Sequence, residues 1–170
     1  MTWNRISPTL IFLLLFQGCA IYSFSGASLP PETKTFSLQF QSDVASGPPD
    51  LLDKFQQRLG EELGRRTRLK QVASQGDLRM EGVIKGFKYT SVAPRRVDEQ
   101  EQASLERLTI TVQMNYINPY NKEAAFSKRT FYHSADKPAD DSREAKEPQL
   151  IEDIFAKLVK DIFNATVASW

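Results

Sequence analysis

The sequence contains one cysteine and one histidine among its 170 residues. A single thiol leaves no intramolecular disulfide, so packing alone must hold the fold together. A metal site or a histidine-based triad would need partners that the chain barely offers around His133. Phosphate-binding glycine loops, G-x-S-x-G and H-E-x-x-H are missing as well. The sequence therefore argues against an enzyme and against a cofactor, and we interpret His133 as an ordinary strand histidine with Ser134 on the opposite face.

The chain also has no excess of charge of either sign. It carries 22 basic and 21 acidic residues, and removal of residues 1–18 would take away only Arg5, leaving 21 of each. A nucleic-acid-binding protein needs a basic excess to contact phosphates. Nucleic acid is therefore excluded as a partner.

The longest apolar run, Leu10 to Phe16, is well short of the roughly 20 residues that cross a bilayer as a permanent helix. It follows a short segment carrying Arg5 and precedes Gly18 and Cys19, which is the order of a secretory signal peptide ending in a lipobox. Phe16 stands where such sites prefer Leu. We predict that residues 1–18 are removed and that Cys19 receives the lipid; the alternative is a stray thiol beside an ordinary signal peptide. Residues 19–32, which end in two prolines, are expected to form a tether.

Beyond the tether, the spacing of apolar residues predicts an order of strand, helix, three strands and helix. A bulge is expected near Gly86, where the buried parity switches. Gly60 and Gly64 in the first helix indicate either close approach of another backbone or fraying. The buried parity of the last strand is ambiguous. The predicted elements are strands at 36–40, 69–89 with a turn at Gly76-Asp77, 108–116 and 126–135, a helix at 51–67, a loop at 136–147 and a helix beginning at Pro148.

This order predicts an α+β fold in which two helices pack on one face of a mixed four-stranded sheet. We expect a single domain over residues 33–170.

Arg95 and Arg96 are the only residues of the predicted loops that suggest ligand contact. Guanidinium groups bind phosphates and sugar acids through paired hydrogen bonds, so the pair could hold such an anion. The alternative is an exposed pair balanced by the acids that follow it, since exposed charges are usually solvated.

Four segments together resemble the lipopolysaccharide-assembly lipoprotein family LptE, in the form typical of the Bacteroidetes group. The resemblance covers nearly the whole chain after the signal peptide. The matching segments are Gly18 to Gly26 running on to Pro30-Pro31, Gly76-Asp77-Leu78 with Glu81-Gly82, Arg107 to Val112, and Asp161 to Asn164.

The resemblance implies a non-catalytic protein with two helices on a four-stranded sheet that plugs an LptD-type β-barrel while lipopolysaccharide passes to the cell surface. Ala20 stands where an inner-membrane retention signal would place Asp, so the family pattern implies the outer membrane, with the domain on the periplasmic side or within the barrel. The glycolipid-contacting bases of distant family members cannot be carried onto this chain residue by residue. Contact by Arg95 and Arg96 is therefore a hypothesis.

A free-standing lipoprotein that binds a sugar or lipid by itself is the alternative function. A preformed apolar pocket would favour that protein, and its absence would favour the plug.

Overall fold

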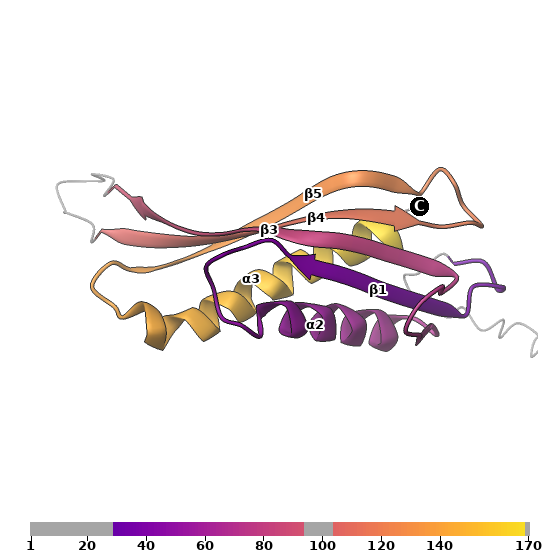
Figure 1. The fold of residues 1–170 in the computed structure, drawn as a ribbon, viewed down its shortest axis with the longest axis horizontal. Coiled ribbons are helices and arrows are strands. Elements are labelled where there is room, and N and C mark those ends of the chain that lie inside the picture. The colour runs from indigo at the N-terminus through magenta and orange to yellow at the C-terminus, as the bar shows by residue number, and fades with distance from the viewer. Residues whose placement is uncertain (1–28, 94–103, 169–170) are drawn as a thin grey trace, which may run out of the picture.

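The computed structural model describes residues 29–93 and 104–168 and contains one mixed sheet with two helices on the same face (Figure 1). The spatial order of the strands is β2-β1-β3-β4-β5. β1 pairs in parallel with both β2 and β3, whereas β3, β4 and β5 are antiparallel neighbours. The elements are β1 (Thr35–Ser42), α2 (Leu51–Arg66), β2 (Lys70–Gln71), β3 (Leu78–Val92), β4 (Leu105–Ile117), β5 (Phe126–Pro138) and α3 (Arg143–Thr166).

Strict alternation of apolar and polar residues makes β4 the clearest strand of the sheet. Every second side chain from Leu108 to Tyr116 is buried toward the helices, and the residues between them are partly exposed on the other face. Successive side chains of a strand point to opposite faces, so this pattern fixes the orientation of the strand. The predicted strand at 108–116 is confirmed and extends to Leu105 and Ile117.

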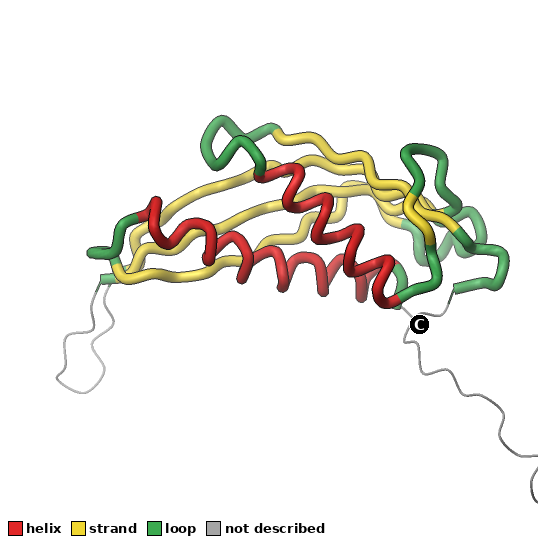
Figure 2. The backbone as a smooth tube through the Cα atoms, turned by 90° about the horizontal axis from the view of Figure 1, so that it is seen from below, coloured by secondary structure: helices red, strands yellow, loops and turns green. Residues whose placement is uncertain are grey.

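The two helices cover the apolar face of the sheet and also contact each other (Figure 2). The fully buried ring of Phe55 in α2 makes edge contacts with Phe40 of β1 at 5.2 Å between centroids and with Phe155 of α3 at 5.4 Å. Such pairs add stabilisation beyond the burial of their area. Phe55 therefore joins the sheet and both helices in one core.

Register shifts explain two irregularities of the sequence pattern. The β3–β4 ladder shifts between Ile84 and Gly86, which confirms the bulge expected there. A second shift, between Met114 and Tyr116 in the β4–β5 ladder, accompanies Lys128, whose φ of 52° is positive. That second bulge changes the phase of β5, which is why its buried parity is ambiguous in the sequence.

The predicted α+β class is confirmed, but the sheet has five strands rather than four. The turn predicted at Gly76 and Asp77 separates β2 from β3, and the short segment before it forms a strand of its own, which the predicted four strands do not include. β2 has only two residues, too few for any periodicity to appear.

The helix expected to begin at Pro148 begins at Arg143 instead, so the predicted loop at 136–147 is wrong over much of its length. Ser142 caps the helix by accepting a hydrogen bond from the Ala145 amide at 3.4 Å. β5 also runs on to Pro138, past its expected end. Pro148 lies inside α3, where it lacks the N–H of an ordinary helical residue.

The two helix glycines prove to have different surroundings. A Cβ on Gly60 would lie 2.6 Å from the Gln71 side-chain oxygen, so the atoms that approach this glycine most closely belong to side chains rather than to another backbone. A Cβ on Gly64 would meet nothing within 4 Å, and α2 continues past both glycines to Arg66.

Neither helix in the described ranges combines the length and apolarity needed to span a membrane.

Candidate functional site

The three residues singled out by sequence, Cys19, Arg95 and Arg96, lie outside the described residues. The strands on either side of the arginine segment are described, and their last paired residues are Val92 and Leu105. The polar groups nearest this end of the sheet are therefore the structural setting of that segment.

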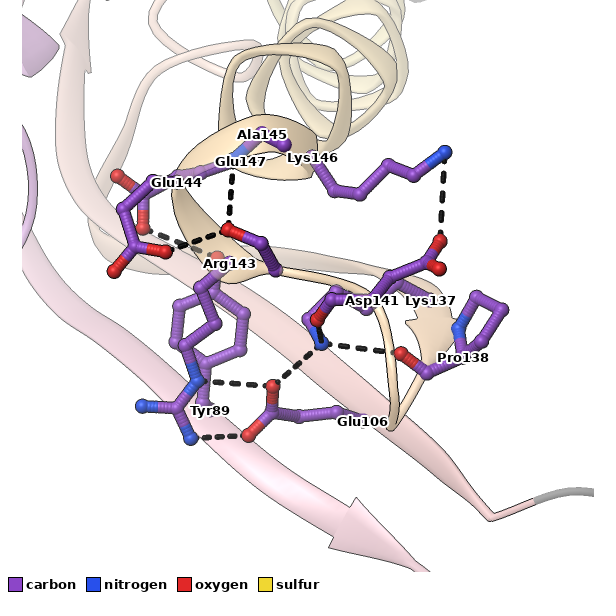
Figure 3. A network of polar contacts seen from close by, with 11 residues as sticks. Tyr89, Glu106, Lys137, Pro138, Asp141, Arg143, Glu144, Ala145, Lys146 and Glu147 are labelled. Atoms are coloured by element: carbon purple, nitrogen blue, oxygen red, sulfur yellow. Dashed lines mark hydrogen bonds and ion pairs between the residues drawn. The ribbon is translucent and has the colours of Figure 1, made fainter.

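A polar network centred on Glu106 joins β4, β5 and α3 next to this end (Figure 3). The Arg143 guanidinium donates to both carboxylate oxygens of Glu106, from Nε at 2.9 Å and also from its terminal nitrogen. Lys137 Nζ lies 3.1 Å from the same carboxylate. Hydrogen bonds from Arg143, followed by those from Lys137, lower the pKa of Glu106 to about 2. The carboxylate is therefore held ionised.

Lys137 is buried, with only 2% of its side chain exposed. Its ammonium donates to the backbone carbonyls of Pro138 at 3.1 Å and of Asp141 at 2.7 Å, in addition to its contact with Glu106. A buried charge is tolerated only when it is paired and hydrogen-bonded, and three acceptors meet that requirement here. Lys137 thus binds the turn between β5 and α3 to β4.

Tyr89 of β3 connects a third strand to the same network. The Arg143 guanidinium lies 4.7 Å above its ring centroid, and the Tyr89 hydroxyl donates to Glu147 of α3 at 3.1 Å. Burial, together with the Glu147 carboxylate, raises the pKa of Tyr89 well above its ordinary value. The phenol therefore remains a neutral hydrogen-bond donor.

The first turn of α3 completes the network. Ser142 Oγ donates to the Glu144 carboxylate at 2.7 Å while it also caps the helix, and Lys146 pairs with Asp141 at 3.4 Å. An acid in the first turn suits the positive end of a helix dipole. Three strands and a helix start are thus fixed together near the paired ends of β3 and β4 at Val92 and Leu105.

This network could not be predicted from the sequence pattern. Its members are dispersed along the chain, and hydrophobic periodicity says nothing about a buried lysine. Ser142, which precedes the charged run from Arg143 to Glu147, is a signal that could have placed the helix start correctly. Every charged group in the network already has a partner. The network therefore holds these strands and the helix start together, and it leaves no free charge for catalysis.

His133 lies on β5, where its Nε2 is 2.7 Å from the Asp161 carboxylate of α3. Ser134 bonds Thr109 at 2.8 Å on the other face of the sheet, so the predicted separation of His133 and Ser134 is confirmed. Among the described residues, no three metal-binding side chains gather in one place. His133 joins a strand to a helix.

The sheet face turned away from the helices carries hydroxyl and amide side chains. Cross-strand pairs on β4 and β5 include Thr109 with Ser134, Thr111 with Tyr132, and Gln113 with Thr130. Tyr132 is 68% exposed. Nearer the arginine segment, Arg107 forms paired hydrogen bonds with Asp136 at 2.6 and 2.7 Å, which lowers the pKa of Asp136. This outer sheet face, made by β3, β4 and β5, is polar, and β3 adds the charged residues Arg79, Glu81 and Lys88 to it.

A model of a family described as lipopolysaccharide-assembly LptE matches residues 33–166 of this chain. The match includes every described strand and helix, from β1 to the end of α3. No protein with a curated description matches the sequence.

Several solved structures resemble the fold at low sequence identity. An uncharacterised lipoprotein B from Nitrosomonas europaea is 15% identical, covers 79% of this chain and 81% of its own, and has a TM-score of 0.48. A minor lipoprotein from Acinetobacter baumannii is 17% identical, with 76% and 89% covered and a TM-score of 0.45. PelC from Paraburkholderia phytofirmans, a dodecamer, is 9% identical, with 83% and 92% covered and a TM-score of 0.49.

Proposed function

The chain belongs to the LptE lipopolysaccharide-assembly family, and we propose on this premise that it plugs and stabilises an LptD-type β-barrel through which lipopolysaccharide reaches the cell surface. Membership implies a part in lipopolysaccharide assembly, and the family is one of non-enzymatic lipoproteins. What we propose beyond family membership is that the partner is an LptD-type barrel and that this protein sits inside it as a plug.

The outer sheet face is the observation that best supports a plug. The interior of a large membrane barrel is polar, so a protein lodged there needs a polar surface on the side that meets the barrel wall. Thr109, Thr111, Gln113 and Thr130 present hydroxyl and amide groups on that face, and Tyr132 adds an exposed ring with a polar edge. These groups can exchange hydrogen bonds with lumen side chains without burying an unpaired charge.

The proposed attachment of the protein to the membrane rests on its N-terminal sequence. We place cleavage after Gly18, lipid on Cys19, a tether over 19–32 and a single domain over 33–170, held at the outer membrane on its periplasmic side or within the barrel. Three acyl chains make such an anchor durable, whereas one would be marginal. Arg95 and Arg96 remain the proposed glycolipid contacts, presented by strands that the Glu106 network fixes in place.

Co-purification tests the partner directly. A C-terminally tagged protein is extracted from outer membranes in mild detergent, in its natural form and as a Cys19→Ala variant. We expect a large β-barrel in near-equal amount with the natural protein and much less with the variant, because loss of the lipid removes the protein from the membrane.

A matched pair of substitutions then tests the outer sheet face. Gln113→Arg adds a long cation on this face, and Gln57→Arg makes the same change on the exposed side of α2. We expect the first to reduce the recovered barrel while both proteins keep their helical circular dichroism. Recovery of the natural protein without any barrel would contradict the plug and favour a free-standing sugar- or lipid-binding lipoprotein.

A further inference from the structure

A cavity of about 660 Å³ lies where the described chain begins, between residues 29–34 and the end of α2. Its walls are mainly of two kinds. Leu29, Pro30, Pro31 and Leu69 form the apolar part, Lys34, Arg65, Arg66 and Arg68 form the cationic part, and Thr33 and Thr67 complete the lining. None of the described lining residues is acidic. An opening with these walls suits a ligand that joins an anion to an apolar group.

The positive charge around the cavity is only partly balanced. Glu62 is shared by Arg65 and Arg66, with the Arg66 contact at 2.5 Å. Arg66 also lies 5.1 Å above the Phe163 ring, which holds its side chain against α3. Within the described ranges, no ion pair involves the side chains of Lys34 or Arg68. Asp77 also lies close, since its carboxylate accepts a hydrogen bond from the Lys34 amide at 2.9 Å. With Glu32, Glu62 and Asp77 all counted, four bases still face three acids.

Thr33 supplies an independent observation at the same cavity. It lines the wall and is only 8% exposed, and its hydroxyl is the one buried side-chain polar atom in the described residues that has no hydrogen-bond partner. Buried polar groups nearly always have a partner, so an exception points to a position that another molecule completes. A phosphate oxygen beside Thr33 could accept this hydrogen bond.

The cavity also lies close to the lipid anchor proposed above. Leu29 lies ten positions after Cys19, and an extended chain spans at most about 3.5 Å per residue, so the cavity is within about 35 Å of the attachment point. β3 begins near the cavity at Leu78 and runs for 15 residues, about 45 Å, to its other end at Val92 (Figure 1). The cavity and the Glu106 network therefore lie toward opposite ends of the sheet.

From this cavity we infer that the protein binds the phosphate of an anionic phospholipid headgroup, with Lys34 and Arg68 as its principal cations and Thr33 as a hydrogen-bond donor. The headgroup lies in the leaflet that holds the lipid anchor, so this inference rests on the proposed lipidation of Cys19 but not on the barrel partner. The apolar wall favours a lipid over free phosphate, because it can receive the glycerol and the first methylenes of the acyl chains.

Binding of soluble short-chain lipids to the detergent-purified full-length protein tests the inference. The probes are dihexanoylphosphatidylglycerol, dihexanoylphosphatidylcholine and inorganic phosphate. The test variant is Lys34→Gln/Arg68→Gln, and the control Lys54→Gln/Lys157→Gln loses the same charge on α2 and α3, outside both the cavity lining and the outer sheet face. Each base near an anionic surface contributes about fivefold in affinity, so the test variant should bind phosphatidylglycerol about 25-fold more weakly.

The natural protein and the control are expected to bind phosphatidylglycerol at least about tenfold more tightly than phosphatidylcholine or inorganic phosphate, and added salt should weaken that binding. Equal binding of phosphatidylglycerol by the test and control variants would overturn the site. Equal binding of the two lipids would contradict the requirement for an anionic headgroup. Inorganic phosphate bound as tightly as phosphatidylglycerol would contradict the assignment of a lipid as the ligand. Barrel recovery, measured separately on the same variants, should stay unchanged, so this result and the plug proposal can fail independently.

Discussion

Replacement of Lys137 by Met isolates the contribution of one buried ammonium to the fold. The methionine can fill much of the space of the lysine stem, but it removes the donor that the Glu106 carboxylate and the carbonyls of Pro138 and Asp141 share. Glu106 keeps its paired contact with Arg143, so the principal loss is at the two carbonyls. A hydrogen bond to a charged donor contributes about 1.5–3 kcal/mol, and removal of a buried charge offsets part of the loss. We expect a net destabilisation of about 2–3 kcal/mol.

Lys85→Met is the matched control, because it makes the same change in an exposed ion pair. Lys85 contacts Asp43 at 2.9 Å, but 45% of the lysine side chain and 66% of the aspartate side chain are exposed. Such pairs contribute little, so the control should lose about 0.5 kcal/mol or less. Urea unfolding of the detergent-purified proteins, followed by far-ultraviolet circular dichroism, gives both free energies. If Lys137→Met is no more destabilising than Lys85→Met, the argument that Lys137 fixes the β5–α3 turn is refuted.

Three further perturbations test other parts of the structure. Because the pKa of Glu106 is lower in the folded protein than in the unfolded chain, its ionised carboxylate stabilises the fold at neutral pH, and this stabilisation is lost as the pH falls from about 5 to about 2. Glu106→Gln should therefore make the free energy of unfolding depend less steeply on pH in this range, and an unchanged pH dependence would contradict the assignment. Gly82→Ala places a Cβ 2.6 Å from the backbone oxygen of Gln113 and should lower stability by about 1–3 kcal/mol in thermal melting, whereas Gly64→Ala, in open space, should not. Phe55→Ala removes the buried ring that joins the sheet to both helices and should cost about 3–5 kcal/mol in urea unfolding. Phe55→Leu keeps aliphatic bulk without the ring and should lose less but still about 1 kcal/mol; a Leu variant as stable as the natural protein would argue against the aromatic contacts.

Periodicity predicted the parts of the fold that have one buried face. The alternating residues of β4 and the apolar spacing in α2 specify both the element and its orientation, because burial repeats along each of them. The bulge at Gly86 could also be predicted, since a change of parity needs an extra residue to keep apolar side chains in the core.

The same reasoning fails where tertiary polar contacts decide the structure. α3 starts at Arg143 because Ser142 caps it and Arg143 reaches Glu106, and neither contact has a hydrophobic signature. β5 continues to Pro138 because Lys137 is buried by its three acceptors, although a lysine in a sequence suggests an exposed position. The cationic cavity escaped prediction for a related reason, because it combines residues 29–34 with residues 65–69 only after β1 and β2 pair.

The position of β1 within the sheet has a consequence for how the chain folds. β3, β4 and β5 are joined in chain order as antiparallel neighbours, so their pairing closes short loops. β1 pairs in parallel with β3 only after α2 has crossed between them, and contacts that are distant in sequence form more slowly. The meander of β3 to β5 can therefore nucleate first, with the β1–α2 segment docking onto it afterwards. If the chain is anchored through Cys19, the β1–α2 segment nearest the anchor would be the last to fold. The cavity beside Thr33 would then form at the membrane surface as folding finishes.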